Sequence, residues 1–240
     1  MPRLFVDLPL APGQLLTLPP GPSRHVQVLR LQPGDGLVLF NGQGGEWAAT
    51  VTRMGRQEVE VRLDHPLDTD RELPRAVTLA VGMPANERMD WLVEKATELG
   101  AAAFAPLVCE RSVLRLAGER AQKKQAHWQG VAVAAAEQSG RTRVPAVHGL
   151  RPLREGLAAL DAGATRWVLS LRDDAAPLPQ ALRELPAEGS LVLLSGPEGG
   201  LSPAEEDLAR SIGHRPVNLG PRVLRAETAP LAVLAALAVV

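Results

Sequence analysis

The chain has 240 residues, of which 45% are hydrophobic and 22% are charged, and its formal net charge is −1. This composition is typical of a globular protein with a sizeable core, and the near-neutral charge gives no global argument for nucleic-acid binding. The single cysteine excludes an internal disulfide, and no apolar run has the length of a membrane span. We therefore expect a cytoplasmic protein without a membrane partner.

Residues 1–70 are predicted to form a small β domain. Val38–Phe40 and Trp47–Val51 are apolar runs that flank the turn sequence NGQGG, which indicates a hairpin. Glu58–Leu63 then alternates polar and apolar side chains, as a half-buried strand does. Several short strands of this kind are typical of a barrel-like module.

Residues 75–240 are predicted to form a separate α/β domain. The polar, proline-containing segment 64–74 has no apolar period and marks the boundary. Beyond it, apolar runs alternate with helical periods, an order that favours a mainly parallel sheet covered on both faces. We expect strands at residues 76–81, 101–108, 144–147, 167–171, 191–194 and 216–219, and helices at 89–99, around Trp128, at 153–160, at 178–185, from 203 onward and at the carboxyl terminus.

Basic side chains gather in two stretches of the chain. The short helix predicted at 25–31 brings together Arg24 and Arg30, which are either ordinary solvated charges or an RNA-facing surface. Between Ala105 and Pro145, seven Arg or Lys stand against three Glu, which indicates either a solvated helix face or contacts to phosphates. The candidate RNA-binding residues of this second stretch are Arg111, Arg115, Lys123, Lys124 and Arg143, together with a polar cluster suited to reading a base edge, Glu137, Gln138 and Arg141.

Two glycine-proline loops dominate the carboxyl-terminal part of the chain. Ser195–Gly200 (SGPEGG) follows one apolar strand, and Leu219–Thr228 (LGPRVLRAET) follows a second. Glycines allow backbone amides to approach a ligand closely. Ligands of parallel sheets bind beyond the carboxyl ends of the strands, which are here expected near Leu171, Ser195 and Leu219. We therefore expect both loops to border one pocket.

The helix that follows the first loop bears on the chemistry of the ligand. Ser202, Pro203 and Glu205 match an N-cap, a first helical residue and a capping-box partner. Glu205, Glu206 and Asp207 crowd the first turn, where they suit the helix dipole but repel a phosphate. Neither of the phosphate-binding motifs GxGxxG and GxxxxGK[ST] is present. The sequence therefore predicts a nucleoside-like ligand without a polyphosphate tail.

Two other kinds of chemistry find no support in the sequence. The five histidines are scattered singly, so no His and Cys cluster has metal-ligand spacing, and we expect no metal. Ser195 and Ser202 do not lie in a GxSxG nucleophile elbow, so acyl transfer is not indicated. Cys109 is interpreted as a small buried hydrophobic residue.

Four motifs, in this order, closely resemble the ribosomal RNA small subunit methyltransferase E family of the SPOUT superfamily. They are residues 88–113 (RMDWLVEKATELGAAAFAPLVCERSV), 127–145 (HWQGVAVAAAEQSGRTRVP), 194–202 (LSGPEGGLS) and 219–229 (LGPRVLRAETA). The segments RLFVD and LRLQPGDGLVLFNGQGGEW are similar to the family's PUA-like RNA-binding domain. The resemblance implies a SPOUT-type α/β trefoil-knot domain at 75–240 behind a PUA-like β-barrel at 1–70.

The resemblance also implies an activity. Members of this family are homodimers that use S-adenosyl-L-methionine to methylate N3 of one uridine in the 16S ribosomal RNA of the small subunit, and their knot loops hold the cofactor. On this chain the expected cofactor-binding residues are Leu171, Ser195, Gly196, Pro197, Gly199, Gly200, Leu219, Gly220, Val223, Leu224 and Thr228. The alternatives are a SPOUT methyltransferase for another RNA position and a ribosome-assembly factor without turnover, and the intact loops speak against the latter.

Methylation of uridine N3 requires a free lone pair on a nitrogen that carries a proton at neutral pH. Either a base removes this proton or a cation stabilises the anion that is left behind. We expect Arg225 to stabilise the developing negative charge on the uracil carbonyls. Glu198 and Glu227 are the candidate bases, with water as a competitor.

Overall fold

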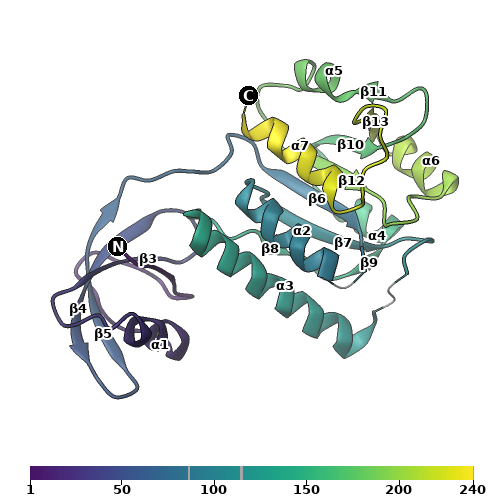
Figure 1. The fold of residues 1–240 in the computed structure, drawn as a ribbon. Helices are drawn as coiled ribbons and strands as arrows, with labels where there is room; N and C mark the ends of the chain where they lie inside the picture. The colour runs from purple at the N-terminus through teal and green to yellow at the C-terminus, as the bar shows by residue number, and fades with distance from the viewer. Residues whose placement is uncertain (86, 114–115, 240) are drawn as a thin grey trace. The chain divides into compact units, whose positions relative to one another are not determined.

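The computed structural model describes residues 1–85, 87–113 and 116–239, which separate into two compact units (Figure 1). The first unit comprises Met1–Glu72 and Val133–Val144, and the second comprises Leu73–Ala132 and Pro145–Val240. The domain limits expected from the sequence, 1–70 and 75–240, differ from these units because residues 133–144 cluster with the first one. The limits of the functional domains stay a prediction.

The first unit is a small sheet with one helix. Its strands follow the order β1-β3-β4-β5-β2, with β1 parallel to β3 and the other pairs antiparallel. The elements are β1 (Arg3–Phe5), β2 (Leu15–Thr17), α1 (Pro20–Val28), β3 (Gly36–Phe40), β4 (Glu46–Met54) and β5 (Val59–Leu67). The predicted hairpin is confirmed as β3 and β4, in which Leu39 pairs with Trp47. The helix expected at 25–31 begins earlier and ends at Val28, since Arg30 adopts a left-handed φ of 58° that a helix cannot continue.

Arg3 ties the segment 133–144 to this sheet. Its guanidinium lies 3.6 Å from the centre of the Phe40 ring, and its Nε donates to Glu46 Oε2 at 2.7 Å. Nη1 donates to the carbonyl of Ala136 at 3.0 Å, near the end of helix α3 (Gly118–Ser139), where backbone carbonyls lack helical partners. Burial alone would raise the pKa of Glu46, but the hydrogen bonds from Arg3 and Thr69 outweigh it and lower that pKa.

The second unit is built on a parallel sheet. Its strands follow the order β11-β13-β10-β12-β6-β7-β8, with β9 paired to β7, and within the described residues every pair is parallel. The strands are β6 (Val77–Gly82), β7 (Ala103–Val108), β8 (Ala146–Val147), β9 (Arg151–Pro152), β10 (Thr165–Leu169), β11 (Ala176–Pro177), β12 (Leu191–Ser195) and β13 (Arg215–Asn218). The predicted α/β class with a mainly parallel sheet is therefore confirmed. The two-residue strands β9 and β11 were not expected, because they are too short to show an apolar period.

Helices cover both faces of this sheet. Besides α3 they are α2 (Glu87–Glu98), α4 (Leu153–Ala158), α5 (Leu178–Arg183), α6 (Pro203–Ser211) and α7 (Thr228–Ala238). All residues of β12 are buried, which requires cover on both sides because successive side chains of a strand point to opposite faces. Helices α4 and α6 pack on the face that carries Val192 and Leu194, whereas α7 lies beside α2 and contacts β12 (Figure 1).

Local signals explain where several of these helices begin and end. The predicted capping box of α6 is confirmed, since Ser202 Oγ accepts from the amide of Glu205 and the Glu205 carboxylate accepts from the amide of Ser202. Helix α2 ends at Glu98, before Gly100 with its φ of 96°. Asn86, a residue type that suits an N-cap, precedes this helix in the sequence but lies outside the described residues. Trp128 of α3 is buried, and its Nε1 donates to Asp90.

The sequence predicts neither a membrane span nor a metal site. No helix in the described ranges is both long and apolar enough to cross a membrane. The described residues also contain no group of three or more His, Cys, Asp or Glu side chains placed to hold a metal ion. The trefoil knot implied by the resemblance stays a prediction.

His214, just beyond α6, is a buried titratable group. Its Nδ1–H donates to the carbonyl of Ala209 at 3.1 Å, and its Nε2 has no hydrogen-bond partner within the described part of the chain. Burial lowers the pKa of His214 from 6.5 to about 4, because the imidazolium would lose its hydration. The fold therefore accommodates the neutral ring and resists its protonation.

We predict that this residue makes stability depend on pH. Between pH 6.5 and about 4 the unfolded chain binds a proton that the folded chain does not, so the free energy of unfolding falls with falling pH, by up to about 3 kcal/mol in total. Above pH 6.5 the ring is neutral in both the folded and the unfolded chain, so this residue does not make the free energy of unfolding depend on pH. His214→Asn keeps an N–H donor but cannot titrate, so urea unfolding at pH about 7.5 and about 5 should show a smaller loss in the variant than in the wild type. Equal losses would contradict this assignment.

Candidate functional site

A cavity of about 540 Å³ lies in the second unit at the carboxyl ends of the adjacent strands β10, β12 and β13. Leu169 and Ser195 are the last residues of β10 and β12 and line its floor, with Val217 from β13. The loop 196–201 and residues 219 and 222–226 supply much of the remaining wall. Ligands of α/β sheets bind at this edge, and both glycine-proline loops meet here as the sequence predicts.

Close backbone packing shapes the first loop. A Cβ on Gly196 would lie 2.7 Å from the amide nitrogen of Leu201, so the loop folds back on itself only with glycine at this position. A Cβ on Gly82, at the end of β6, would lie 2.5 Å from Cδ of Pro197 and 2.9 Å from Sγ of Cys109. The end of β6 thus fixes the position of the loop.

Cys109 lies behind this loop and takes no part in the surface of the cavity. Burial raises the pKa of its thiol to about 12, and the nearby carboxylate of Glu205 acts in the same direction. Its interpretation as a small buried hydrophobic residue is confirmed, because a thiol that stays protonated is a poor nucleophile.

The start of α6 offers little to a phosphate. The amides of Ser202 and Glu205 are used by the capping box, and the amide of Glu206 donates to the carbonyl of Ser202. The carboxylate of Glu205 also accepts from the amide of Glu110 at 2.7 Å, and that of Glu206 faces the cavity. A helix end that is already capped and negatively charged does not attract an anion.

Ser195 carries a polar atom without a partner. Its side chain is buried and lines the cavity, yet its Oγ makes no hydrogen bond within the described ranges. Buried hydroxyl groups are nearly always hydrogen-bonded, so this atom is expected to bond to a group that enters the cavity.

Four arginines line the cavity, but they differ in their partners. Arg111 donates to the carbonyl of Gly199 at 3.0 Å and so holds the first loop, and Arg88 donates to Glu198 at 3.3 Å. The exposed side chains of Arg222 and Arg225 have no hydrogen bond or ion pair among the described residues. Their charges are therefore available to an anionic group.

Arg88 stands between the two carboxylates expected to act in catalysis. Glu198 Oε1 accepts from the amide of Ala85 at 2.8 Å and from Arg88 Nη1 at 3.3 Å. Arg88 Nε lies 4.0 Å from Glu227 Oε1, whereas the buried Glu227 Oε2 has no partner in the described part of the chain. The start of α2 is thereby tied to both loops of the cavity.

Most of the expected site residues lie together at the cavity. Of the three expected catalytic residues, Arg225 and Glu198 line it and the buried Glu227 does not. Gly220 and Thr228 are also absent from the wall, Gly220 being the turn residue with a φ of 95°. The expected cofactor-binding residues that line the cavity are Leu171, Ser195, Gly196, Pro197, Gly199, Gly200, Leu219, Val223 and Leu224.

The sequence analysis missed several residues of the wall. Arg88 has a recognisable signal, because a cation in the first turn of a helix opposes the helix dipole and needs another reason to be there. Glu206 was interpreted only as a charge that repels phosphate. The other lining residues that were not expected are Leu169, Ser170, Leu201, Val217, Arg222, Ala226 and Ala229, and Arg111 was expected only as an RNA contact.

The expected RNA-binding residues of the first unit fall into two groups. Arg24, Arg30 and Arg143 are exposed, as is Gln138. Arg141, in contrast, is buried, and its Nε donates to Glu72 at 3.0 Å, while Glu137 accepts from the amide of Phe5 at 2.9 Å. In the structure both side chains hold the fold of this unit, and contact of Arg141 and Glu137 with RNA stays a prediction.

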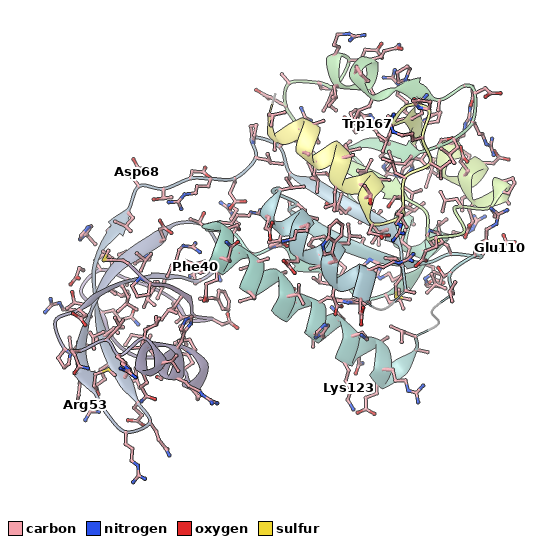
Figure 2. The ribbon with its side chains drawn as sticks, viewed as in Figure 1. Phe40, Arg53, Asp68, Glu110, Lys123 and Trp167 are labelled. Carbon is pink, nitrogen blue, oxygen red and sulfur yellow. The ribbon has the colours of Figure 1, made fainter. Side chains whose placement is uncertain are left out.

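The expected RNA-binding residues of the second unit are Arg111, Lys123 and Lys124, while Arg115 lies outside the described residues. Lys123 projects from the first half of α3 (Figure 2) and forms an exposed ion pair with Glu119 at 2.8 Å. Such a pair is weak in water, so it leaves the ammonium group accessible to phosphates. Contact of these residues with RNA stays a prediction.

Comparison with known proteins places this geometry in a family. The RNA methyltransferase domain family matches residues 71–238, and the RNA methyltransferase PUA domain family matches residues 23–64. Ribosomal RNA small subunit methyltransferase E of Bacillus subtilis is 34% identical over 216 residues, covering 88% of this chain and 84% of its own length. The protein of the same name from Synechocystis is 35% identical over 234 residues, covering 95% and 75%.

Solved structures give the same result. Ribosomal RNA small subunit methyltransferase E from Neisseria gonorrhoeae, solved with S-adenosyl methionine bound, superposes with a TM-score of 0.89 at 38% identity and covers 98% of this chain and 96% of that one. A methyltransferase from Legionella pneumophila with the same bound cofactor gives 0.88 at 34% identity, with coverages of 98% and 96%. The α/β fold with an amino-terminal PUA-like domain is shared over nearly the full length, and the chain belongs to the ribosomal RNA small subunit methyltransferase E family of SPOUT methyltransferases.

Proposed function

We propose that this protein is a cytoplasmic methyltransferase that uses S-adenosyl-L-methionine to modify N3 of a uridine in 16S ribosomal RNA. The observation that carries the proposal is the cavity at the ends of β10, β12 and β13, because the two loops that resemble the family form much of its wall. A relative of 38% identity holds S-adenosyl methionine in its solved structure, which supports the choice of cofactor.

The residues of the cavity fit this cofactor. The volume of about 540 Å³ falls within the range of roughly 300–1,000 Å³ that small-molecule sites occupy. Leu169, Leu171 and Leu224 offer apolar surface to a base, and the unpartnered Ser195 hydroxyl offers a hydrogen bond. The capped and acidic start of α6 suits a ligand without phosphate. We propose that the cofactor is held by Leu171, Ser195, Gly196, Pro197, Gly199, Gly200, Leu219, Val223 and Leu224, with Gly220 and Thr228 shaping the second loop.

Arg225 is assigned to the acceptor side of the reaction. The bound cofactor supplies a methyl group on a positively charged sulfur, and the acceptor must present a lone pair in line with it. Loss of the N3 proton leaves negative charge on the uracil carbonyls, and a guanidinium aimed at that charge stabilises the transition state. Arg225 lines the cavity and is exposed, with no side-chain partner in the described ranges, which suits it for this role.

Glu198 and Glu227 differ as acceptors for the uridine proton. Glu198 already accepts from Ala85 and Arg88, and we assign it to holding the first loop. Glu227 keeps one free oxygen but does not line the cavity, so we assign it to proton removal through a water molecule. Glu227→Gln should lower kcat by roughly 100- to 10,000-fold while cofactor affinity stays unchanged, because the variant cannot accept the proton. An unchanged kcat would exclude this residue as the base.

We further propose that the exposed basic residues contact the ribosomal RNA and that the protein acts as a homodimer, as the resemblance implies. Phosphate contacts would make RNA affinity fall steeply with salt concentration, and each lost contact would reduce that dependence. The proposed RNA contacts are Arg24, Arg30, Arg111, Lys123, Lys124, Gln138 and Arg143.

The homodimer has a test of its own. Light scattering that gives the mass of a single chain would exclude it.

Gly82→Ala should weaken binding of S-adenosylmethionine. The added methyl group would overlap Pro197 and Cys109, and overpacking of this kind costs roughly 1–3 kcal/mol, part of which appears as lost affinity of the displaced loop. Isothermal titration gives the affinity, and thermal unfolding reports any loss of stability. Gly130→Ala is the matched control, since a Cβ there meets nothing within 4 Å. Wild-type affinity in Gly82→Ala would show that this contact does not position the binding loop.

Arg225→Ala should abolish most of the activity while leaving the fold and cofactor affinity nearly unchanged. Removal of one donor to a developing anion lowers kcat by roughly 100- to 1,000-fold. Mass spectrometry of 16S ribosomal RNA nucleosides, from cells that lack the gene and carry wild type, Arg225→Ala or Arg183→Ala, gives the readout. We expect N3-methyluridine with the wild type and with the exposed control Arg183→Ala only. Unchanged N3-methyluridine in cells without the gene would refute the proposed function.

A further inference from the structure

The cavity has two chemically different sides. Arg88 and Glu198 meet beside the end of β6, and the sheet order places β12 between that strand and β10. On the β10 side stand Ser170 and Glu206, which line the cavity and come from the end of β10 and the first turn of α6. The basic residues Arg88, Arg111, Arg222 and Arg225 belong to α2 and to loops of the cavity, and none of them contacts Ser170 or Glu206 in the described ranges.

One oxygen of the Glu206 carboxylate is already held in place. Its Oε1 accepts from the hydroxyl of Ser170 at 2.6 Å and lies 3.4 Å from Nε of Arg172. Ser170 Oγ in turn accepts from the amide of Arg172 at 3.1 Å, so the hydroxyl has both a donor and an acceptor role. The side chain of Glu206 is only 13% exposed, and its Oε2 makes no hydrogen bond within the described part of the chain. A carboxylate that lines the cavity is therefore fixed through one oxygen and keeps the other free to accept a hydrogen bond.

Arg172 partly offsets the charge of Glu206. It contacts both Glu206 and Asp207, the latter at 2.7 Å, so one cation faces two carboxylates and the start of α6 keeps a negative charge. A charged carboxylate is a strong acceptor for hydroxyl donors. The buried hydroxyl of Ser195, which also lines the cavity and lacks a partner, is a second and independent sign that a polar ligand group is accommodated here.

We infer that Glu206 accepts a hydrogen bond from a ribose hydroxyl of the adenosyl group, and that Ser170 and Arg172 hold its carboxylate for this purpose. This inference rests on the proposed cofactor. It makes Glu206 a specificity-determining residue for the sugar, and it leaves the arginines to the amino-acid carboxylate and the RNA. Ser170 is a positioning residue, since its own hydroxyl is fully used by Glu206 and Arg172.

Isothermal titration with three ligands tests the inference. S-adenosylmethionine carries both the ribose and the amino-acid group, 5′-methylthioadenosine lacks the amino-acid group, and 2′,3′-dideoxyadenosine lacks both ribose hydroxyls and the amino-acid group. Glu206→Gln should lower the affinity for S-adenosylmethionine and for 5′-methylthioadenosine by a similar factor of about ten, as expected for the loss of a hydrogen bond to a charged group. It should not change the affinity for 2′,3′-dideoxyadenosine. Ser170→Ala should show the same ligand dependence with a smaller factor. Glu188→Gln is the matched control, because it makes the same chemical change at an exposed residue that does not line the cavity, and it should leave all three affinities unchanged.

Three results would overturn the inference in different ways. If Glu206→Gln weakens S-adenosylmethionine but not 5′-methylthioadenosine, the carboxylate binds the ammonium group instead. If the variant, with a wild-type melting temperature, binds every ligand as the wild type does, Glu206 contacts no ligand. If the wild type itself binds neither adenosyl ligand, the proposed cofactor is wrong and the role of Glu206 falls with it.

Discussion

The cavity depends on one backbone constraint, the fold-back of the loop after β12 at Gly196. The amide of Leu201 takes the space that a Cβ on Gly196 would fill, so the loop folds back on itself before α6 begins at Pro203. Gly82 and Pro197 make an equally close contact from the neighbouring strand β6. The loop is therefore set by packed backbone, and this part of the cavity wall is largely preformed.

The arginines that line the cavity have two different roles. Arg111 donates to the carbonyl of Gly199 and Arg88 donates to the carboxylate of Glu198, so these two side chains hold the first loop. Arg222 and Arg225 keep their guanidinium groups free in the described part of the chain, on the wall of the same cavity. Methyl transfer needs alignment more than it needs a nucleophilic side chain, and this arrangement fits that need because the structural ion pairs fix the loops while a separate cation remains for the acceptor.

The sequence predicts the parts of this structure that depend on local signals. The alternation of strands and helices, the hairpin of β3 and β4, the capping box at Ser202 and the meeting of two loops all follow from apolar period or turn chemistry. What it does not predict depends on partners far along the chain. The hydrogen bonds of Arg141 to Glu72 and of Glu137 to the amide of Phe5 are examples, since no local signal in the sequence predicts these partners. The contact of Arg88 with Glu198 spans 110 residues, a separation over which no periodic pattern carries information.

Hydrogen exchange with and without S-adenosylmethionine is the most direct measurement of the central claim, that the cavity between these loops binds the cofactor. Binding should slow exchange of the amides in 196–201 and 219–226, which border the cavity, and should leave the β3–β4 hairpin of the first unit unchanged. The account would be contradicted if saturating cofactor slowed amide exchange in neither loop. It would also be contradicted if exchange slowed only in residues away from the ends of β10, β12 and β13.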